Sequence, residues 1–269
     1  WDNWRTGTAT RNFKMAALNK HIFTIRYQEG TTTPLGTDAW VDGVSTPAVQ
    51  ANTYASGLAG LAASSPESYY NNTWIGAGHG TTGGNLFKGT LYDIIWYDAL
   101  LTDDEVQNTH DYLMNKHEMK NFDVYHGFTP TAPLPIVDER LRWWMDASDA
   151  STYELDTNGQ VTSWTSKDYA NEAGTGTIGG AAVTPTDDKG FLFADGYFQG
   201  YNCPFFKDSN FTCFLVFKYD DYSGSLFGQT ASSQTYGAYA IGRMSDSNVF
   251  NWDNWRTGTA TRNFKMAAL

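Results

Sequence analysis

The acidic and histidine side chains are the residues of this sequence that could carry out catalysis. Hydrolysis of a glycosidic bond needs two carboxyl groups that face each other across the bond. On a strand, such groups are expected at alternate positions, because alternate side chains share one face. Asp93 and Asp98 are five positions apart, so they fall on opposite faces and are expected at strand edges or turns. The seven glutamates are scattered: Glu29, Glu67, Glu105, Glu118, Glu139, Glu154 and Glu172. The sequence therefore predicts no glycosidase pair.

Histidine and cysteine give no stronger indication of an enzyme. The five histidines are isolated in the sequence, and only His79, between two glycines, is expected in a loop. Cys213 falls in an apolar strand and Cys203 in the loop before it. A disulfide across this short span and a pair of thiols both remain open, because geometry decides between them. No Cys or His spacing is typical of a zinc site. We expect no catalytic residues.

Aromatic and amide side chains are the residues that could bind a sugar. Aromatic rings stack on the C–H faces of sugars, while amides bind their hydroxyl groups. The candidate glycan-binding residues are Trp1, Asn3, Trp4, Tyr69, Tyr70, Asn72 and Trp74. The alternative is that large aromatic side chains fill the core, which we favour for Trp40, Trp96, Trp143 and Trp164.

Two aspartates are candidate ligands for a metal ion. Asp146 and Asp149 follow an apolar segment, and Ca²⁺ prefers carboxylate oxygens as ligands. The alternative is that Asp146 bonds to backbone groups at the end of a strand, and we favour it. The chain has 22 Asp and 7 Glu, a bias that suits a β protein rich in turns. Ca²⁺ is thus the only cofactor expected, and only as an alternative.

Net charge and hydropathy narrow the expected partners. The formal net charge is −11, which argues against nucleic acid and against an anionic membrane. No run of about eighteen apolar residues is present, so no membrane insertion is expected. Aromatic residues make up 16% of the chain and hydrophobic residues 41%, enough for a sizeable core.

A long internal repeat is the most specific feature of the sequence. Residues 1–18 (WDNWRTGTATRNFKMAAL) and 252–269 are identical over eighteen positions, at an offset of 251 residues. Chance cannot account for this identity. An artefact or an engineered permutant is one explanation. We favour a longer protein with nearly identical tandem units, of which slightly more than one is present here.

Short strands separated by turn residues dominate the expected secondary structure. The apolar segment 86–97 is expected to be a strand buried on both faces. Asp42-Gly43 is typical of a tight hairpin turn, and 171–190 is expected to be a loop rich in Gly, Thr and Ala. One helix is predicted at about 102–117, because Thr102 and Glu105 form a capping box.

Four segments share residue patterns with one known family. They are 144–150 (WMDASDA) with 161–164 (VTSW), 89–98 (GTLYDIIWYD) with 102–106 (TDDEV), 211–217 (FTCFLVF) and 41–43 (VDG). The first resembles the opening, and the second the close, of a concanavalin-like (laminin G-like) jelly-roll domain. The other two resemble a central strand and a hairpin. The resemblance implies an all-β, antiparallel jelly-roll sandwich. It also implies glycan or protein binding through loops at the sandwich edge, sometimes with Ca²⁺.

The order of these motifs departs from the family, because the closing segment comes first. Joining units through the repeat restores the usual order. We therefore expect residues 1–120 to be the C-terminal half of one domain, 121–137 a Pro-containing linker and 138–269 the N-terminal half of the next domain. The sequence leaves open whether the halves pair within one chain or between chains.

These observations predict a non-catalytic repeat unit of an extracellular structural or adhesive filament, on a cell or virion surface. Its expected partners are neighbouring copies of itself in a head-to-tail array, and a cell-surface or environmental polysaccharide. The alternative function is a glycan-binding lectin module of a secreted carbohydrate-active protein.

Overall fold

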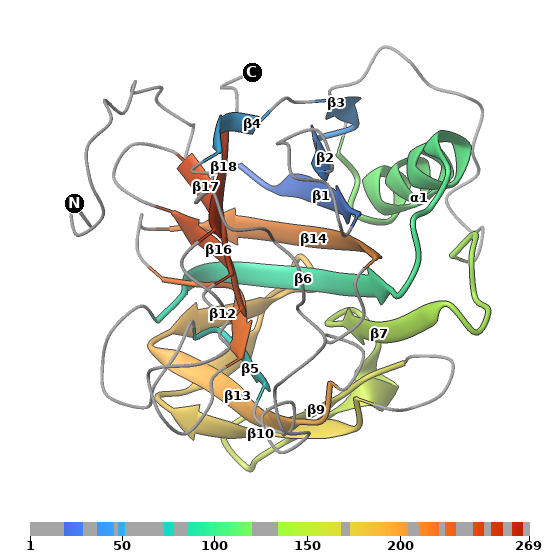
Figure 1. Cartoon of the computed structure of the whole chain (residues 1–269). Helices are drawn as coiled ribbons and strands as arrows, with labels where there is room; N and C mark the ends of the chain where they lie inside the picture. Colours follow the sequence, from blue (N-terminus) through green and yellow to red (C-terminus); the bar gives the residue numbers. More distant parts are fainter. Residues whose placement is uncertain are drawn as a thin grey trace.

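The computed structural model confirms an all-β protein in which two antiparallel sheets form a sandwich with one helix (Figure 1). The structure describes residues 19–28, 37–45, 48–51, 73–77, 86–119, 134–167, 173–203, 210–220, 224–229, 239–244, 249–254 and 260–265. Within these residues, no helix is both long and apolar enough to cross a membrane.

Sheet A is built around β6 (Lys88–Tyr97), the buried strand that the sequence predicts. The strand order is β11-β12-β6-β14-β1-β2-β3, and β7 also pairs with β6. One edge of β6 carries β12 near its start and β7 near its end, while β14 covers the other edge. The other strands are β1 (His21–Tyr27), β2 (Thr37–Val41), β3 (Val44–Ser45), β7 (Leu141–Asp146), β11 (Val183–Pro185), β12 (Phe191–Ala194) and β14 (Phe211–Tyr219).

Sheet B has the order β4-β18-β17-β16-β15-β5-β13-β10-β9-β8. Its first strands are β4 (Ala48–Ala51), β5 (Thr73–Ile75), β8 (Tyr153–Leu155), β9 (Val161–Thr165) and β10 (Thr175–Gly180). Its later strands are β13 (Gly196–Tyr201), β15 (Phe227–Gln229), β16 (Tyr239–Met244), β17 (Val249–Asn254) and β18 (Ala260–Lys265).

Each sheet contains strands from both ends of the chain, and in each sheet one strand of one part lies between two strands of the other part. We call the described residues of 19–119 the front block and those of 134–265 the back block. In sheet A, β14 of the back block lies between β1 and β6 of the front block. In sheet B, β5 of the front block lies between β13 and β15 of the back block. The two blocks therefore complete one sandwich within this chain.

The structure describes part of the second copy of the repeat but not the first copy. The second copy supplies the end of β17 and all of β18, which form a hairpin at one end of sheet B. The first copy, residues 1–18, lies outside the described residues.

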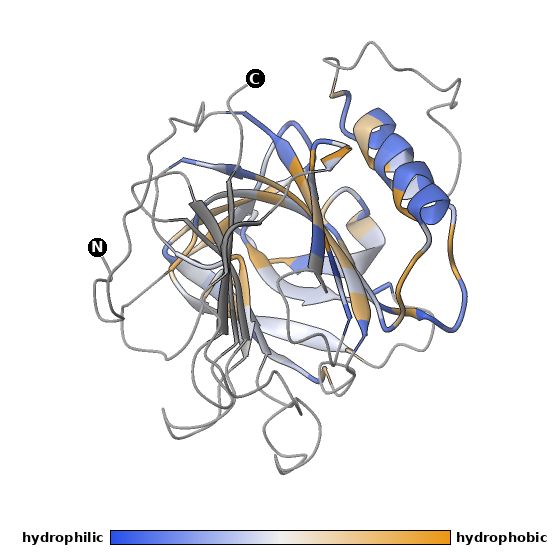
Figure 2. Ribbon diagram, turned by 45° about the horizontal axis from the view of Figure 1, so that its top comes forward, coloured by the Kyte–Doolittle hydropathy of each residue, from blue (hydrophilic) through white to orange (hydrophobic). Residues whose placement is uncertain are grey.

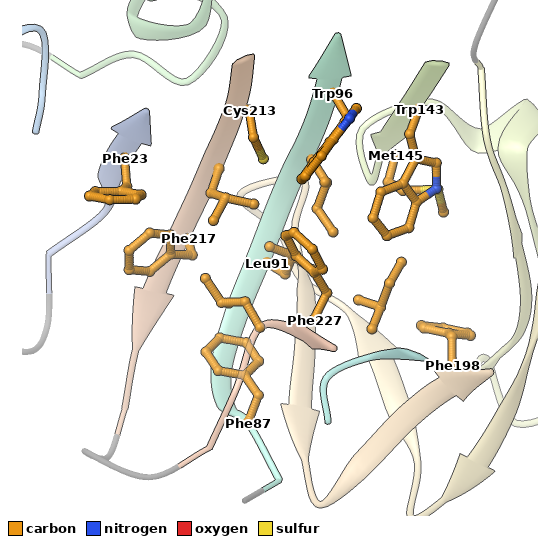
Figure 3. Packing of buried hydrophobic residues seen from close by; sticks show 14 of the residues in the cluster. Phe23, Phe87, Leu91, Trp96, Trp143, Met145, Phe198, Cys213, Phe217 and Phe227 are labelled. Carbon is orange, nitrogen blue, oxygen red and sulfur yellow. The ribbon is translucent and has the colours of Figure 1, made fainter. Parts of the chain in front are cut away.

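An apolar core rich in aromatic rings fills the space between the sheets. Trp96 on β6 stacks on Phe211 of β14, with ring centroids 4.1 Å apart. Figure 3 shows Trp96 and Trp143 close to Phe227, while Phe23 and Phe217 lie further along the same layer. The core positions favoured for Trp96, Trp143 and Trp164 are confirmed, since each is at most 1% exposed. Trp40 is partly buried against a second cluster on the outer face of sheet A.

Helix α1 (Asp103–Lys116) confirms the predicted element and its capping box. Thr102 is the N-cap: its side chain accepts a hydrogen bond from the Glu105 amide, and Glu105 accepts one from the Thr102 amide. The helix lies on the outer face of sheet A, and apolar and polar residues mix along it (Figures 1 and 2). Its buried stripe, Val106, Thr109, His110 and Leu113, packs toward the sheet.

The glycine-rich segment 171–190 is not a continuous loop, as the sequence suggested, because it contains β10 and β11. Its glycines make room for tyrosines of the neighbouring strand. A Cβ on Gly176 would lie 2.3 Å from the Tyr201 ring, and one on Gly179 would lie 2.4 Å from the Tyr197 ring. The weak strand propensity of glycine is offset by packing that only glycine permits.

Two other turns position the strands. Asp195, with a φ of 87°, takes the chain from β12 in sheet A to β13 in sheet B. The predicted hairpin turn is confirmed, with φ values of 51° at Asp42 and 81° at Gly43. Asp42 is buried and accepts hydrogen bonds from the Ile22 amide and from His21, both at 2.8 Å.

Candidate functional site

The contact between the front and back blocks is the candidate functional site, because polar groups of both blocks meet there in a buried position. Asp93 of β6 is its centre and is 0% exposed. Both Asp93 oxygens accept hydrogen bonds from Lys116 Nζ, at 2.8 and 2.9 Å, and Oδ2 lies 2.6 Å from His117 Nε2. From the back block, Trp144 Nε1 donates to Asp93 Oδ1 at 3.0 Å. We call these groups and those described next the buried ionic network.

Charges of alternating sign continue the buried ionic network into the back block. Lys116 Nζ lies 2.7 Å from Asp146 Oδ1, so this one ammonium group joins the two blocks. Asp146 Oδ2 lies 3.1 Å from Lys167 Nζ, which is in turn 2.8 Å from Asp149 Oδ2. The Trp144 ring lies 4.2 Å below the Lys167 ammonium group, a cation–π distance. The carboxylates of Asp93, Asp146 and Asp149 thus alternate with the ammonium groups of Lys116 and Lys167.

Helix and strand geometry place these side chains together. Asp93 shares the outer face of β6 with Ile95 and Tyr97, which pack in the cluster under the helix. Lys116 is the last helical residue and His117 is the C-cap. Cationic side chains are favoured at this end of a helix, where the macrodipole is negative. The end of α1 is therefore held over β6 and β7 by charge as well as by packing.

The protonation states follow from burial and from the neighbouring charges. Burial by itself raises the pKa of Asp93, but Lys116 and the hydrogen bond from His117 outweigh it and hold the pKa at about 2. Burial lowers the pKa of Lys116, yet Asp93 and Asp146 reverse this and raise it. Burial lowers the pKa of His117, and Asp93 only partly offsets it. The Asp93 carboxylate is therefore ionised at neutral pH and is the acceptor for both Lys116 Nζ and the His117 ring.

The Asp93–His117 pair resembles the orienting half of a catalytic triad, in which a carboxylate fixes the tautomer of a histidine. A triad also needs a nucleophile on the other ring nitrogen. Among the described residues, no Ser or Cys forms a hydrogen bond with His117, and His117 is 7% exposed. The arrangement is suited to fixing a helix on a sheet.

Three further contacts join the two blocks near the start of the helix and the end of β6. Arg140 of the back block donates to Glu105 of the helix at 2.9 Å. Arg142 Nε donates to Asp98 at 2.6 Å. The Thr212 hydroxyl accepts from the Leu101 amide at 3.0 Å and donates to the Ala99 carbonyl at 2.8 Å. These contacts also join the front block to the back block.

The structure corrects one expectation about the aspartates. Asp98 lies at the turn after β6, as expected, and is paired with Arg142. Asp93 is not an edge or turn residue: it lies inside a strand that is paired on both sides. The spacing of Lys116 and His117 at the helix end was visible in the sequence, but nothing local showed that a strand carboxylate would lie beneath them.

The candidate metal ligands Asp146 and Asp149 are both bound to lysine. A Ca²⁺ ion between them would have to displace Lys167, and Lys116 also holds Asp146. Asp146 Oδ1 accepts from the Ser148 amide at 3.0 Å, the backbone bond that the sequence favoured. Within the described part of the chain, no group of three or more His, Cys, Asp or Glu side chains is arranged to hold a metal ion.

The cysteines are thiols, so the disulfide considered from the sequence is not formed. Cys203 and Cys213 both lie in the core between the sheets. Burial raises the pKa of the Cys213 thiol well above its usual value. Cys213 therefore acts as a small apolar side chain.

Most of the candidate glycan-binding residues lie outside the described residues. These are Trp1, Asn3, Trp4, Tyr69, Tyr70 and Asn72. Trp74 is described: it is half-buried on β5, between the buried Thr73 and Ile75, and so faces away from the core. Its partner across the strand pair is Gln199 of β13, which is also half-buried.

Comparisons of the chain with protein-family models, with curated proteins and with solved structures give no match.

Proposed function

We propose that this chain is a non-catalytic repeat unit of an extracellular structural or adhesive filament, built of lectin-like jelly-roll domains. The observation that carries the proposal is the identity of residues 1–18 and 252–269. Near-perfect identity between units is typical of arrays that grow by duplication. A discrete binding module gains avidity from copies but does not require them to be identical.

The contact between the blocks supports this proposal physically. In an array, each back block has two front blocks next to it in the sequence. One precedes it and is connected through the linker; the other follows it directly after the repeat. Any front block supplies the same Asp93, Lys116 and His117 to Trp144 and Asp146. The buried ionic network would then fix the register in which a front block pairs with a back block. A shift of one block along the other would leave charges buried without partners.

The mass of the intact polypeptide tests the proposal. Under denaturing conditions, an array is expected to migrate far above the 29.9 kDa of this chain. An antibody against the segment 134–167 would identify the band. A gene product that holds a single copy of the unit would overturn the proposal.

A glycan-binding lectin module is the second candidate function, and the position of Trp74 favours it. A half-buried Trp beside an amide on the outer face of sheet B is a suitable platform for a sugar ring. Binding of the chain to a glycan array, lost in Trp74→Ala and kept in Trp40→Ala, would support this function. An array on which the chain binds no glycan would count against this function.

A further inference from the structure

Lys116 lies between two buried carboxylates that belong to neighbouring strands. Its Nζ is 2.8 and 2.9 Å from the two oxygens of Asp93 and 2.7 Å from Asp146 Oδ1. The side chain of Asp93 is 0% exposed, that of Asp146 is 5% exposed and that of Lys116 is 14% exposed. A nitrogen at nearly equal distances from both oxygens of a carboxylate faces the carboxyl carbon. The fold therefore holds an amine against a carboxyl carbon, the proximity that favours a reaction within one chain.

We propose that Lys116 and Asp93 form an intramolecular amide (isopeptide) bond in the folded chain, with Asp146 as the proton relay. The reaction joins Nζ to the Asp93 carboxyl carbon and releases one water molecule. It needs no oxidant, cofactor or second substrate. The proposal does not depend on the function proposed above, because all three residues belong to one sandwich.

The protons and charges of this reaction balance within the buried ionic network. One proton of the Lys116 ammonium group passes to Asp93 Oδ1, 2.8 Å away, which leaves a neutral amine and a neutral carboxyl group. The amine lone pair forms the C–N bond while an electron pair of the carboxyl group moves to Oδ2. Asp146 takes a second proton from Nζ and returns it to Oδ1, which leaves as water. The third hydrogen stays on the amide nitrogen.

The position of Asp146 suits it to this relay. Asp93 and Asp146 are directly opposite each other in the register of β6 and β7. The Asp146 carboxylate also contacts Lys167, which compensates its charge once Lys116 has reacted. A carboxylate within hydrogen-bond distance of the nucleophile is placed as a general base requires.

Two further groups hold the oxygens of Asp93. The His117 ring donates from Nε2 to Oδ2 at 2.6 Å, and Trp144 Nε1 donates to Oδ1 at 3.0 Å. The hydrogen bond from His117 stabilises the negative charge that develops on Oδ2 during the attack, because the donor is already in place. The environment thus supplies an oxyanion donor as well as a relay.

Burial favours the amide product over the ion pair. The reaction replaces a buried ammonium group and a buried carboxylate by one neutral amide, which removes the desolvation cost of both charges. Because both groups are charged at the start, the first proton transfer makes the reaction slow. The freshly folded chain therefore carries the ion pair, and the bond accumulates afterwards.

The bond ties the end of helix α1 to β6. Asp93 and Lys116 are 23 positions apart, so the bond closes a loop that contains the whole helix. A covalent loop stabilises a fold by restricting the unfolded chain. Both residues lie in the front block, so the bond leaves the two blocks separable in denaturant.

Mass spectrometry of the wild-type chain, folded and incubated at neutral pH, tests the proposal without any variant. The incubated chain should become lighter than its sequence mass by one water molecule. Trypsin does not cut after a lysine whose Nζ is acylated, so residues 89–120 should appear as one looped peptide that has lost water. Without the bond, this region gives the separate peptides 89–116 and 117–120.

Two results would overturn the proposal. One is a folded chain that keeps its full mass throughout the incubation. The other is a water loss that maps to a cross-link between peptides 89–120 and 143–167, which would make Asp146 the acceptor in place of Asp93. Lys116→Arg should keep its full mass, and a water loss in this variant would show that the loss arises elsewhere in the chain.

A matched pair of variants tests the role of Asp146. Asp146→Asn keeps the shape of the side chain but removes the carboxylate next to Nζ. Asp149→Asn removes a carboxylate of the same network that is paired with Lys167. We expect Asp149→Asn to form the bond at the wild-type rate and Asp146→Asn to form it about a hundredfold more slowly. Circular dichroism checks that both variants are folded, and equal rates in the two would refute the relay.

Discussion

The two faces of sheet A join the same two blocks by different physical means. On the inner face, Trp96 and Phe211 stack within an apolar core. On the outer face, the buried ionic network joins Asp93 and Lys116 to Asp146 beneath the helix. Apolar burial supplies most of the free energy of folding but is not directional. Buried charges contribute little net stability, yet they are costly when they are mismatched. The inner face therefore stabilises the union of the blocks, and the outer face sets its register.

Truncation of the inner face should have the largest effect. Trp96→Ala removes a fully buried ring that contacts Phe211 and Phe227. We expect it to lower the free energy of unfolding by about 4 kcal/mol, as core aromatic truncations do, measured by urea denaturation. Leu155→Ala, at a side chain 49% exposed, is the control. A loss below that of the control would show that the two blocks do not pack through this ring.

Breaking the buried ionic network should cost less than losing the core ring. Asp93→Asn keeps the shape of the side chain but removes the negative charge that pairs with Lys116. We expect it to lower the free energy of unfolding by about 3 kcal/mol. Adding Lys116→Met removes the unmatched ammonium group and should restore part of this loss. A double variant that loses the full sum of the single losses would mean that Asp93 and Lys116 do not interact in the folded protein.

Acid should weaken the outer face through His110. Its pKa is lowered to about 4 because it is fully buried, and its Nε2 lies 3.0 Å from the Thr24 hydroxyl. The unfolded chain, with an ordinary pKa of 6.5, binds the proton first. Stability is therefore complete above this value and is lost as the pH falls toward the folded pKa, by about 1.4 kcal/mol per pH unit.

Unfolding of the wild-type chain should therefore become easier by about 2 kcal/mol between pH 6.5 and roughly pH 5. His110→Gln should show a flatter profile over the same range, since it has no imidazole to protonate. Equal slopes for the two proteins would refute the assignment to His110.

Loss of the helix cap should have the smallest effect. Thr102→Ala removes the side chain that accepts from the Glu105 amide, and N-cap losses cost about 1 kcal/mol. Thr162→Ala is a control, because it removes a hydroxyl that donates to the Glu154 carbonyl at 3.2 Å in an exposed position outside the helix. If the two variants were equally stable, the cap would not contribute to holding α1 on sheet A.

Local patterns predicted the local elements of this fold. The helix and its cap, the Asp42-Gly43 turn and the doubly buried strand at 86–97 each depend on residues close together in sequence. The strands β10 and β11 were missed because glycine has weak strand propensity, and only the tyrosines of β13 explain its presence. Such packing is not visible before the strands are paired.

The buried ionic network was missed for the same reason. Asp93 and Asp146 are adjacent in the register of β6 and β7 but are 53 positions apart in the chain. For Asp146 the sequence favours a backbone bond at the end of a strand, with Ca²⁺ as the alternative, and predicts no ionic partner within the protein. The partner is an ammonium group from the end of the helix. A partner that is distant in the sequence, as Lys116 is from Asp146, cannot be identified from local residue patterns.

Cleavage of the segment between the blocks tests most directly whether they hold each other without a covalent link. A specific protease site introduced within residues 120–133 would be cut in the folded chain, and the product analysed by size-exclusion chromatography with light scattering. We predict one particle of unchanged mass, near 29.9 kDa, that separates into two fragments only in denaturant. Two fragments that elute apart in native buffer would contradict the account.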